Sequence, residues 1–175
     1  DFVPSRGLGD VYKRQDNTNN AINNCNGEYI KILFMDDYIY NEDAIYLIVE
    51  HFYKNPDKKW LVNSYMHTKN YKDFYNHHKP YFSHDIALCN RIGCPSCLTI
   101  HKSITNRFDV NLRWFMDSEL YYSIKKVYGS PIFVHTSDSD KPFMINVHHG
   151  DQVSHSCTTS LSNKEKVYIL SLIHI

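Results

Sequence analysis

The stretch Asn26-Gly-Glu-Tyr-Ile-Lys-Ile-Leu-Phe-Met-Asp-Asp-Tyr-Ile-Tyr-Asn-Glu-Asp43 decides the fold expected for this chain. Gly27 ends the segment before it, and the apolar run 29–34 predicts a buried strand. Asp36 and Asp37 follow where that strand ends. Ligands in open α/β sheets bind just beyond the carboxyl ends of strands, and carboxylates there can hold a hard divalent cation. The pair also fits a plain turn, in which Asp forms local hydrogen bonds.

Three helices are predicted around this stretch. The Asn-rich segment 16–26 predicts a short helix that stops before Gly27. Apolar residues recur every three or four positions in 41–55, with Asn41 as the N-cap. The same spacing predicts a helix over 117–128. A further C-terminal helix is expected from a capping box formed by Ser162 and Glu165.

Strands alternate with these helices in the first half of the chain. Strands are expected at 59–66 and 98–102, separated by a long surface excursion over 67–85. Segments 131–136 and 143–148 are expected to pair as a hairpin. The alternation indicates an α/β fold with a mixed sheet.

Length and composition exclude several classes of protein. The 175 residues fit one domain, and 19 Lys plus Arg balance 19 Asp plus Glu, so no charge excess points to nucleic acid. No apolar run approaches the roughly 18–20 residues of a membrane helix, and no signal peptide is visible. Five irregularly spaced cysteines do not predict a disulfide framework. The expected compartment is therefore the cytoplasm.

The two ends look different from the rest of the sequence. Residues 1–15 contain a string similar to a translated sequencing-adaptor tail, and 170–175 is similar to another. Such segments are not expected to contribute to the fold of the natural domain. We expect the natural domain to span about 16–169.

Two further polar clusters could carry chemistry. Asp117 and Glu119 stand in the first turn of a predicted helix, where either could act as a general base. Acids are also favoured there by the helix dipole alone. The segment His148-His-Gly-Asp-Gln-Val-Ser154 could bind a metal or phosphate, or form an ordinary polar loop.

A third cluster contains Cys89, Cys94, Cys97 and His101. The Cys-x-x-Cys spacing permits a zinc site, which would make the chain a small zinc-binding interaction module. All four candidates lie close together in sequence, whereas structural zinc sites usually use two separated pairs. A tight turn explains the same residues.

Taken together, these segments resemble the family 2 glycosyltransferases of GT-A fold. The motifs that carry the resemblance run in the family's order over about residues 17–156: Asn19-Asn-Ala-Ile22, Gly27 to Asp37, Gly93-Cys-Pro-Ser96, Phe115-Met-Asp-Ser-Glu119 and His149-Gly-Asp-Gln-Val-Ser154.

The resemblance implies a GT-A-like mixed sheet flanked by helices, without the family's N-terminal nucleotide-binding βαβ portion. It implies transfer of a sugar from a nucleotide-sugar donor to a hydroxyl of a saccharide or lipid-linked acceptor, with inversion and with Mg²⁺ or Mn²⁺. It also implies no nucleic-acid partner and a place in the cytoplasm, with peripheral association at the inner face of the membrane. Since the base-binding strand lies upstream in the family, we expect this stretch alone to bind donor poorly.

The resemblance also assigns residue roles. The catalytic base is Asp117, with Glu119 as second choice; the donor contacts are Asn19, Asp36 and Asp37; the acceptor contacts are Gly93, Pro95 and Ser96; the metal ligands are Asp36 and His149. Phe34 stands where the family's Asp-x-Asp motif has its first Asp. This departure raises the alternative of a non-catalytic relative.

Overall fold

The computed structural model describes residues 9–137, 141–150 and 157–173, with side chains from Gln15 onward. Within these ranges the helices are α1 (Gly9–Asn23), α2 (Ala44–Lys54), α3 (Met116–Tyr128) and α4 (Thr159–Ile173), with a short 3₁₀ helix, η1 (Pro95–Cys97). The strands form two four-stranded sheets. The first sheet has the order β1 (Tyr29–Lys31), β6 (Leu98–His101), β3 (Trp60–Asn63), β7 (Ile132–Val134). The second has the order β2 (Tyr38–Ile39), β8 (Met144–Val147), β4 (Tyr65–Thr68), β5 (Phe74–His78).

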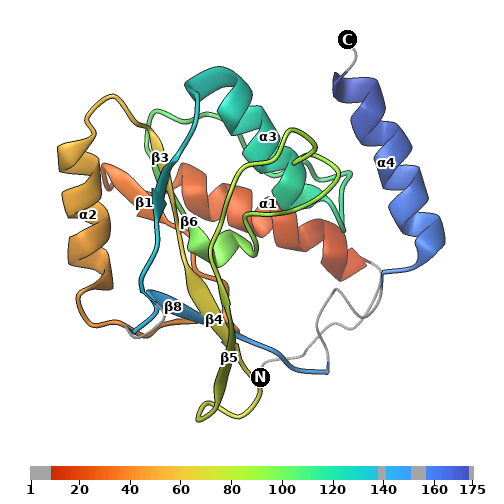
Figure 1. Cartoon of the computed structure of the whole chain (residues 1–175). Coiled ribbons are helices and arrows are strands. Elements are labelled where there is room, and N and C mark those ends of the chain that lie inside the picture. Colours follow the sequence, from red (N-terminus) through yellow and green to blue (C-terminus); the bar gives the residue numbers. More distant parts are fainter. Residues whose placement is uncertain (1–8, 138–140, 151–156, 174–175) are drawn as a thin grey trace, which may run out of the picture.

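The first sheet is covered on both faces. Every residue of β3 is buried, and successive side chains along the strand face opposite sides of the sheet. Trp60 and Val62 pack into the cluster that contains residues of α1 and α3, whereas Leu61 packs with α2. Figure 1 shows α2 on one side of this sheet and α1 with α3 on the other. A strand buried on both faces reads as a continuous apolar run, as 60–62 does.

The second sheet is more polar and more exposed. Its strand β5 has no buried residue. β4 and β5 form an antiparallel hairpin, and β4 runs parallel to β8. This hairpin lies within 65–78, so the prediction of a surface excursion over 67–85 missed a strand. The signal was weak because β5 is Phe-Tyr-Asn-His-His, with little apolar content.

The chain passes from one sheet to the other at Ser64. The backbone N–H of Ser64 donates to Val134 O (2.8 Å), and its hydroxyl oxygen accepts from the Thr136 backbone N–H (3.1 Å). The predicted single strand 59–66 is therefore two strands. The predicted hairpin of 131–136 with 143–148 is wrong, because β7 pairs with β3 and β8 pairs with β2 and β4.

The ends of the helices also differ from the sequence-based expectation. α4 begins at Thr159, and the Leu161 backbone N–H donates to Thr158 Oγ1 (3.2 Å), so the predicted cap at Ser162 is wrong. Glu165 instead accepts from the backbone N–H groups just before α3, which ties α4 to α3. α1 begins at Gly9, earlier than expected, and Gln15 on it is buried against Leu112.

The predicted fold class is confirmed at the level of a mixed α/β fold with sheets flanked by helices. In the described ranges, no helix has both the length and the apolar character required to cross a bilayer.

Candidate functional site

The loop after β1 carries the two adjacent carboxylates in different environments. The Asp37 backbone N–H donates to Phe34 O (3.0 Å), which closes a tight turn. Asp37 is only 8% exposed, and its Oδ1 accepts from Asn146 Nδ2 (2.8 Å) and from the Val147 backbone N–H (3.3 Å). Asp37 therefore fastens this loop to β8.

That attachment brings Asp36 to His149, which follows the end of β8. His149 Nε2 lies 3.0 Å from Asp36 Oδ2, and both side chains are partly exposed. These are the two predicted metal ligands. They come from motifs far apart in the sequence, and the structure brings them together.

A hydrogen-bonded chain continues from Asp37 into the second sheet. Asn146 Nδ2 donates to Asp37, so Asn146 Oδ1 is the atom that faces His67 Nδ1 (2.9 Å). His67 Nδ1 must then carry the proton and donate. Burial and the nearby His148 lower the pKa of His67 to about 4, so its imidazole is neutral at pH 7. Burial also raises the pKa of Asp37, against hydrogen bonds from Ser96, Asn146 and the Val147 backbone.

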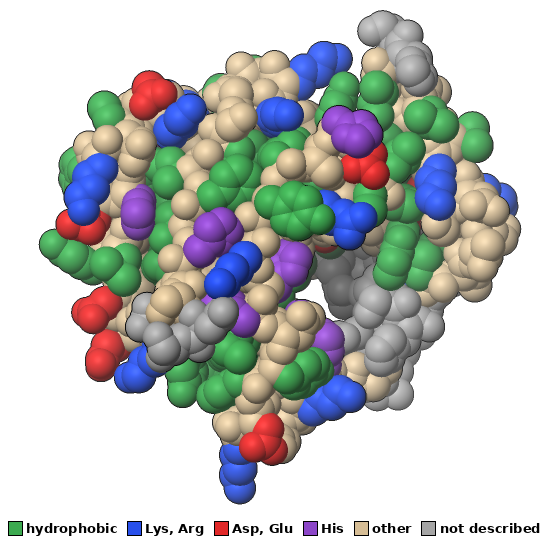
Figure 2. All heavy atoms as spheres, viewed as in Figure 1, with side chains coloured by type: hydrophobic (Ala, Val, Ile, Leu, Met, Phe, Trp, Pro, Cys, Tyr) green, Lys and Arg blue, Asp and Glu red, His purple; other side chains and the backbone are tan. Residues whose placement is uncertain are grey.

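Histidine side chains gather near β4 in the space-filling view (Figure 2). The ring centroids of His67 and His148 are 4.2 Å apart, and Tyr75 OH lies 2.8 Å from His148 Nδ1. This side of the second sheet is therefore lined with polar aromatic groups.

The second acidic site lies at the start of α3. Asn90 Nδ2 donates to Asp117 Oδ2 (2.9 Å). Burial raises the pKa of Asp117 to about 6, against hydrogen bonds from the backbone N–H groups of Asp117 and Ser118 and from Asn90. A carboxyl with a pKa near the working pH is suited to general base catalysis.

Glu119 occupies a different place. Burial, with the charge of Asp109, raises its pKa to about 7. It lines a hollow of about 310 Å³ between α3 and α4, with Tyr122 and Ile169 among the other lining residues. Residues two apart on a helix point roughly 200° apart, so Asp117 and Glu119 do not share a site.

The segment 93–97 contacts both acidic sites. Ser96 Oγ accepts from the Phe34 backbone N–H (2.9 Å), and the Ser96 side chain hydrogen-bonds to Asp37. At its other end, Gly93 O accepts from Asn90 Nδ2 (2.9 Å). The turn predicted here is confirmed and includes η1. Pro95 and Ser96, predicted acceptor contacts, are buried, so the structure gives them a supporting role.

Gly93 is required by the local geometry. Its φ is +108°, and a Cβ there would lie 2.1 Å from the hydroxyl oxygen of Tyr65, which is buried. Its carbonyl oxygen also accepts from Tyr121 OH (3.1 Å). Close packing and a positive φ together require glycine.

A half-buried lysine supports the same segment. Lys31 Nζ donates to Asn63 Oδ1 (2.9 Å) and to Ser96 O (2.5 Å). Burial lowers the pKa of Lys31 to about 8. Sequence reasoning missed Lys31, Asn90 and Asn146 as parts of the site. Lys31 is a single polar residue within a predicted strand, and neither asparagine belongs to a recognisable sequence motif.

Two other predicted positions have structural partners. Asn19 uses both ends of its amide on the backbone of Phe108, donating from Nδ2 (2.8 Å) and accepting at Oδ1 (2.9 Å). Phe34 packs against the main core cluster, where the family has a carboxylate. Gln152 and Ser154 of the last motif lie outside the described residues.

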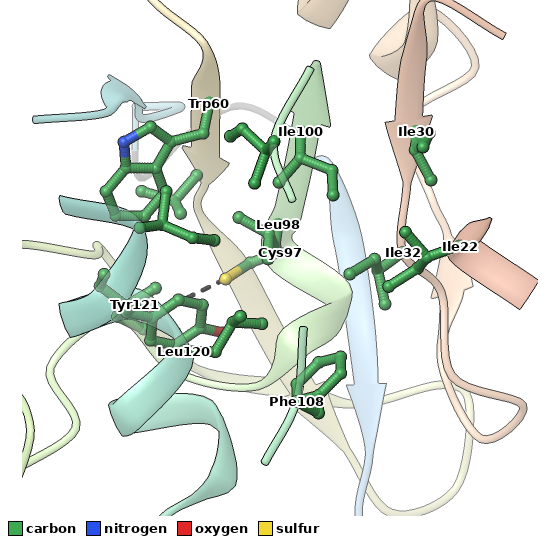
Figure 3. Close-up of a cluster of buried hydrophobic side chains, with 14 of the residues drawn as sticks. Ile22, Ile30, Ile32, Trp60, Cys97, Leu98, Ile100, Phe108, Leu120 and Tyr121 are labelled. Carbon is green, nitrogen blue, oxygen red and sulfur yellow. Dashed lines mark hydrogen bonds between the residues drawn. The ribbon is translucent and has the colours of Figure 1, made fainter. Parts of the chain in front are cut away.

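The residues of the zinc alternative are not gathered into one cluster. Burial raises the pKa of Cys97 to about 12, and its sulfur points at Tyr121 inside the core (Figure 3). Burial also raises the pKa of Cys94 well above its usual value. His101 instead contacts Ser103 Oγ (2.7 Å).

No group of three or more His, Cys, Asp or Glu suited to a metal is found in residues 9–137, 141–150 and 157–173. A protein that binds Mg²⁺ together with a phosphorylated substrate does not need three ligands of its own. Mg²⁺ is commonly held by one or two protein carboxylates, with water and substrate phosphates completing its shell. Asp36 supplies one carboxylate of that kind, and His149 adds an imidazole nitrogen beside it.

Comparison with protein-family models gave no match, and comparison with curated proteins gave none either.

Proposed function

We propose that this chain is part of an inverting glycosyltransferase of GT-A type, which transfers a sugar from a nucleotide-sugar donor to a hydroxyl of a saccharide or lipid-linked acceptor. The observation that carries the proposal is the pairing of Asp36 with His149 at 3.0 Å. Each residue comes from a separate motif of the family that the sequence resembles.

The pair fits a divalent cation. Two ligand atoms on adjacent corners of an octahedral ion lie about 3.0 Å apart when each bond is about 2.1 Å. The same separation makes a hydrogen bond when no ion is bound. Bound to the donor diphosphate, Mg²⁺ or Mn²⁺ would neutralise the charge that grows on the leaving group.

Asp37 then positions Asp36. Its carboxylate is buried and held by Asn146 and by the Val147 backbone, so the loop that carries Asp36 stays fixed to β8. Groups that orient a ligand in this way usually affect metal affinity by about 10–100-fold.

Asp117 acts as the base. With a pKa of about 6, it is mostly ionised at pH 7 and can accept a proton. It takes the proton of the acceptor hydroxyl while that oxygen bonds to the anomeric carbon. The bond from the carbon to the diphosphate oxygen breaks on the opposite face, and the diphosphate leaves with the electron pair. Attack opposite the leaving group inverts the configuration.

Phe34 favours a second candidate, a relative that binds nucleotide sugars without turning them over. Its ring packs against the core where the family motif has a carboxylate. Binding and turnover are therefore tested separately.

The binding test follows free Mn²⁺ by electron paramagnetic resonance while the protein is titrated, with and without UDP. Asp36→Asn and His149→Ala should each weaken Mn²⁺ retention at least about 10-fold, since each removes a direct ligand. Asp57→Asn is the matched control, because its side chain is 76% exposed and lies on a turn after α2. Equal retention by Asp36→Asn and the control would remove the proposed metal site.

Separate substitutions of the two adjacent acids test whether Asp36 and Asp37 have different roles. Asp37→Asn should lower the free energy of unfolding by about 1–3 kcal/mol, because it places an amide among buried donors. Asp36→Asn should change it by less than about 0.5 kcal/mol, since the residue is exposed. Urea unfolding measures both, and equal losses would contradict the assignment of separate roles.

The turnover test measures UDP or GDP release from UDP-glucose, UDP-N-acetylglucosamine and GDP-mannose in the presence of Mn²⁺. Asp117→Asn should lower any release at least about 100-fold, with the exposed-site variant Asp57→Asn as the control. Unchanged release by Asp117→Asn would exclude Asp117 as the base. Measurable release by the wild-type chain would exclude the second candidate.

A further inference from the structure

Asp36 and Asp37 form one edge of an open hollow of about 560 Å³, and the exposed carboxylate on that edge is the one of Asp36. Its other lining residues are Met35, Tyr38, Tyr40 and Tyr71. We propose that this tyrosine hollow is a saccharide subsite, where a sugar ring lies against tyrosine faces and its hydroxyls bond to the acidic edge. The inference rests on the proposed function only for the assignment of the bound sugar as donor or acceptor.

The three tyrosines form one connected aromatic surface. The rings of Tyr38 and Tyr71 are nearly parallel, with centroids 6.0 Å apart and an interplanar angle of 27°. Tyr40 meets Tyr38 edge-on at 6.4 Å and packs edge-on against Phe74 at 4.9 Å. Tyr71 is nevertheless 64% exposed. Large aromatic rings left this open to solvent are available to a ligand.

Tyr71 is held rigidly in an unusual backbone conformation. Its φ is +62°, in a region that residues other than glycine seldom occupy. Thr68 Oγ1 accepts from the Tyr71 backbone N–H (3.0 Å). Asn70 Oδ1 accepts from the backbone N–H groups of Lys72 and Asp73. The backbone that carries the ring is therefore fastened by hydrogen bonds, which lowers the entropy lost on binding.

The composition of the hollow selects the ligand. The C–H face of a sugar packs on an aromatic ring, while its hydroxyls bond to carboxylates and to phenol groups. None of the described residues that line the hollow is basic, so a free anion is disfavoured. A quaternary ammonium ion prefers aromatic rings that enclose it, whereas Tyr38 and Tyr71 lie nearly parallel.

The test is saturation-transfer NMR on the whole chain, with irradiation of aromatic protons. The probes are cellotriose, N,N′,N″-triacetylchitotriose and UDP-glucose, the last with and without diamagnetic Mg²⁺, and tetramethylammonium as the competing class. Sugar-ring protons should receive saturation in the wild type. Tyr71→Asn should reduce it at least about five-fold through loss of one aromatic contact. Asn tolerates a positive φ, so the variant keeps the backbone.

Tyr46→Ala is the matched control, because Tyr46 is 69% exposed on α2, away from the hollow. Its signal should equal that of the wild type. Saturation of an oligosaccharide without metal identifies an acceptor subsite, and saturation of UDP-glucose only with Mg²⁺ identifies a donor-sugar subsite; both support the proposal.

The proposal is overturned by no saturation of any sugar in folded wild-type protein, or by equal signals in wild type and Tyr71→Asn. It is also overturned by equal losses in Tyr71→Asn and Tyr46→Ala, or by binding of tetramethylammonium alone. Mn²⁺ retention that is independent of Asp36 would contradict the proposed metal site and leave this subsite standing.

Discussion

The two sheets share a strand number, a mixture of parallel and antiparallel pairs and a continuous chain from β3 into β4, yet their strands differ in burial, because β2 and β5 of the second sheet have no buried residue. In the first sheet, β3 is entirely buried between helices. In the second, β5 has no buried residue, and β4 contributes His67 to a polar network. Truncation in β3 is therefore expected to cost more stability than truncation in β5, although β4 and β8 of the second sheet are largely buried.

The candidate site lies where the two sheets meet. The loop from β1 of the first sheet carries Asp36 and Asp37, and β8 of the second sheet holds it. Asp117, the acid of the second acidic site, lies at the start of α3, which packs on the first sheet. This division is expected if a rigid core positions residues whose own contacts are polar.

The largest expected loss of stability comes from truncating Trp60 in the first sheet. Trp60 is 0% exposed, stacks on Tyr121 and donates from Nε1 to Gly129 O (2.8 Å). Trp60→Ala should lower the free energy of unfolding by about 3–5 kcal/mol, through lost burial and a residual cavity. Tyr75→Ala in β5 should cost only about 1 kcal/mol, since Tyr75 is 37% exposed. Similar losses in urea unfolding would show that the sheets do not differ in this way.

A second effect concerns the turn between the acidic sites. Gly93→Ala should cost about 2–4 kcal/mol, since the added methyl meets the buried Tyr65 and φ is +108°. Gly129→Ala is the control, because φ is +77° there but nothing lies within 4 Å of the added Cβ. With ψ at −168° this backbone region is nearly restricted to glycine, so Gly129→Ala should cost about 1–3 kcal/mol from strain alone, less than Gly93→Ala. Thermal unfolding measures both, and equal losses would exclude a packing role for Gly93.

The smallest effects are pH-dependent and have opposite signs in the two regions. Asp117 has a folded pKa of about 6 against an ordinary 3.8, so the folded state binds its proton more tightly. Its contribution to stability therefore falls as pH rises from about 4 to 6. His67 has a folded pKa of about 4 against 6.5, so its contribution is lost as pH falls through that window.

Unfolding free energies between pH 4 and 7 separate these two contributions. Asp117→Asn should remove roughly 1–2 kcal/mol of the loss with rising pH, and His67→Asn should remove a similar loss with falling pH. Asn at 67 keeps a donor for Asn146 Oδ1, so the network is conserved. A pH profile unchanged in either variant would show that the group does not titrate as its surroundings indicate.

Sequence reasoning placed the helices and the strands of the first sheet where apolar spacing was clear. The helix expected over 41–55 is α2, although Asp43 and not the predicted Asn41 is its N-cap, and the helix expected over 117–128 is α3. It failed at the second sheet, because β5 has no hydrophobic alternation and Ser64 gives no sign that a strand changes sheets. The hairpin of 131–136 with 143–148 was wrong because both segments found partners distant in sequence.

The candidate site shows the same division. Acidic pairs and a late histidine could be selected from the sequence, and the structure brings Asp36 to His149. The separation of Asp36 from Asp37 could not be predicted, because neighbouring residues of the same type differ only in burial. Asn90 and Asn146 were missed because their partners lie on other elements.

The sequence by itself determined the local elements and the residue types available for chemistry, since spacing of apolar residues and caps acts over a few positions. Tertiary structure alone decided which carboxylate is buried, which histidine meets Asp36 and which tyrosines share a hollow. These choices depend on contacts between residues distant in the chain, whose burial and hydrogen bonds arise only when the two sheets assemble.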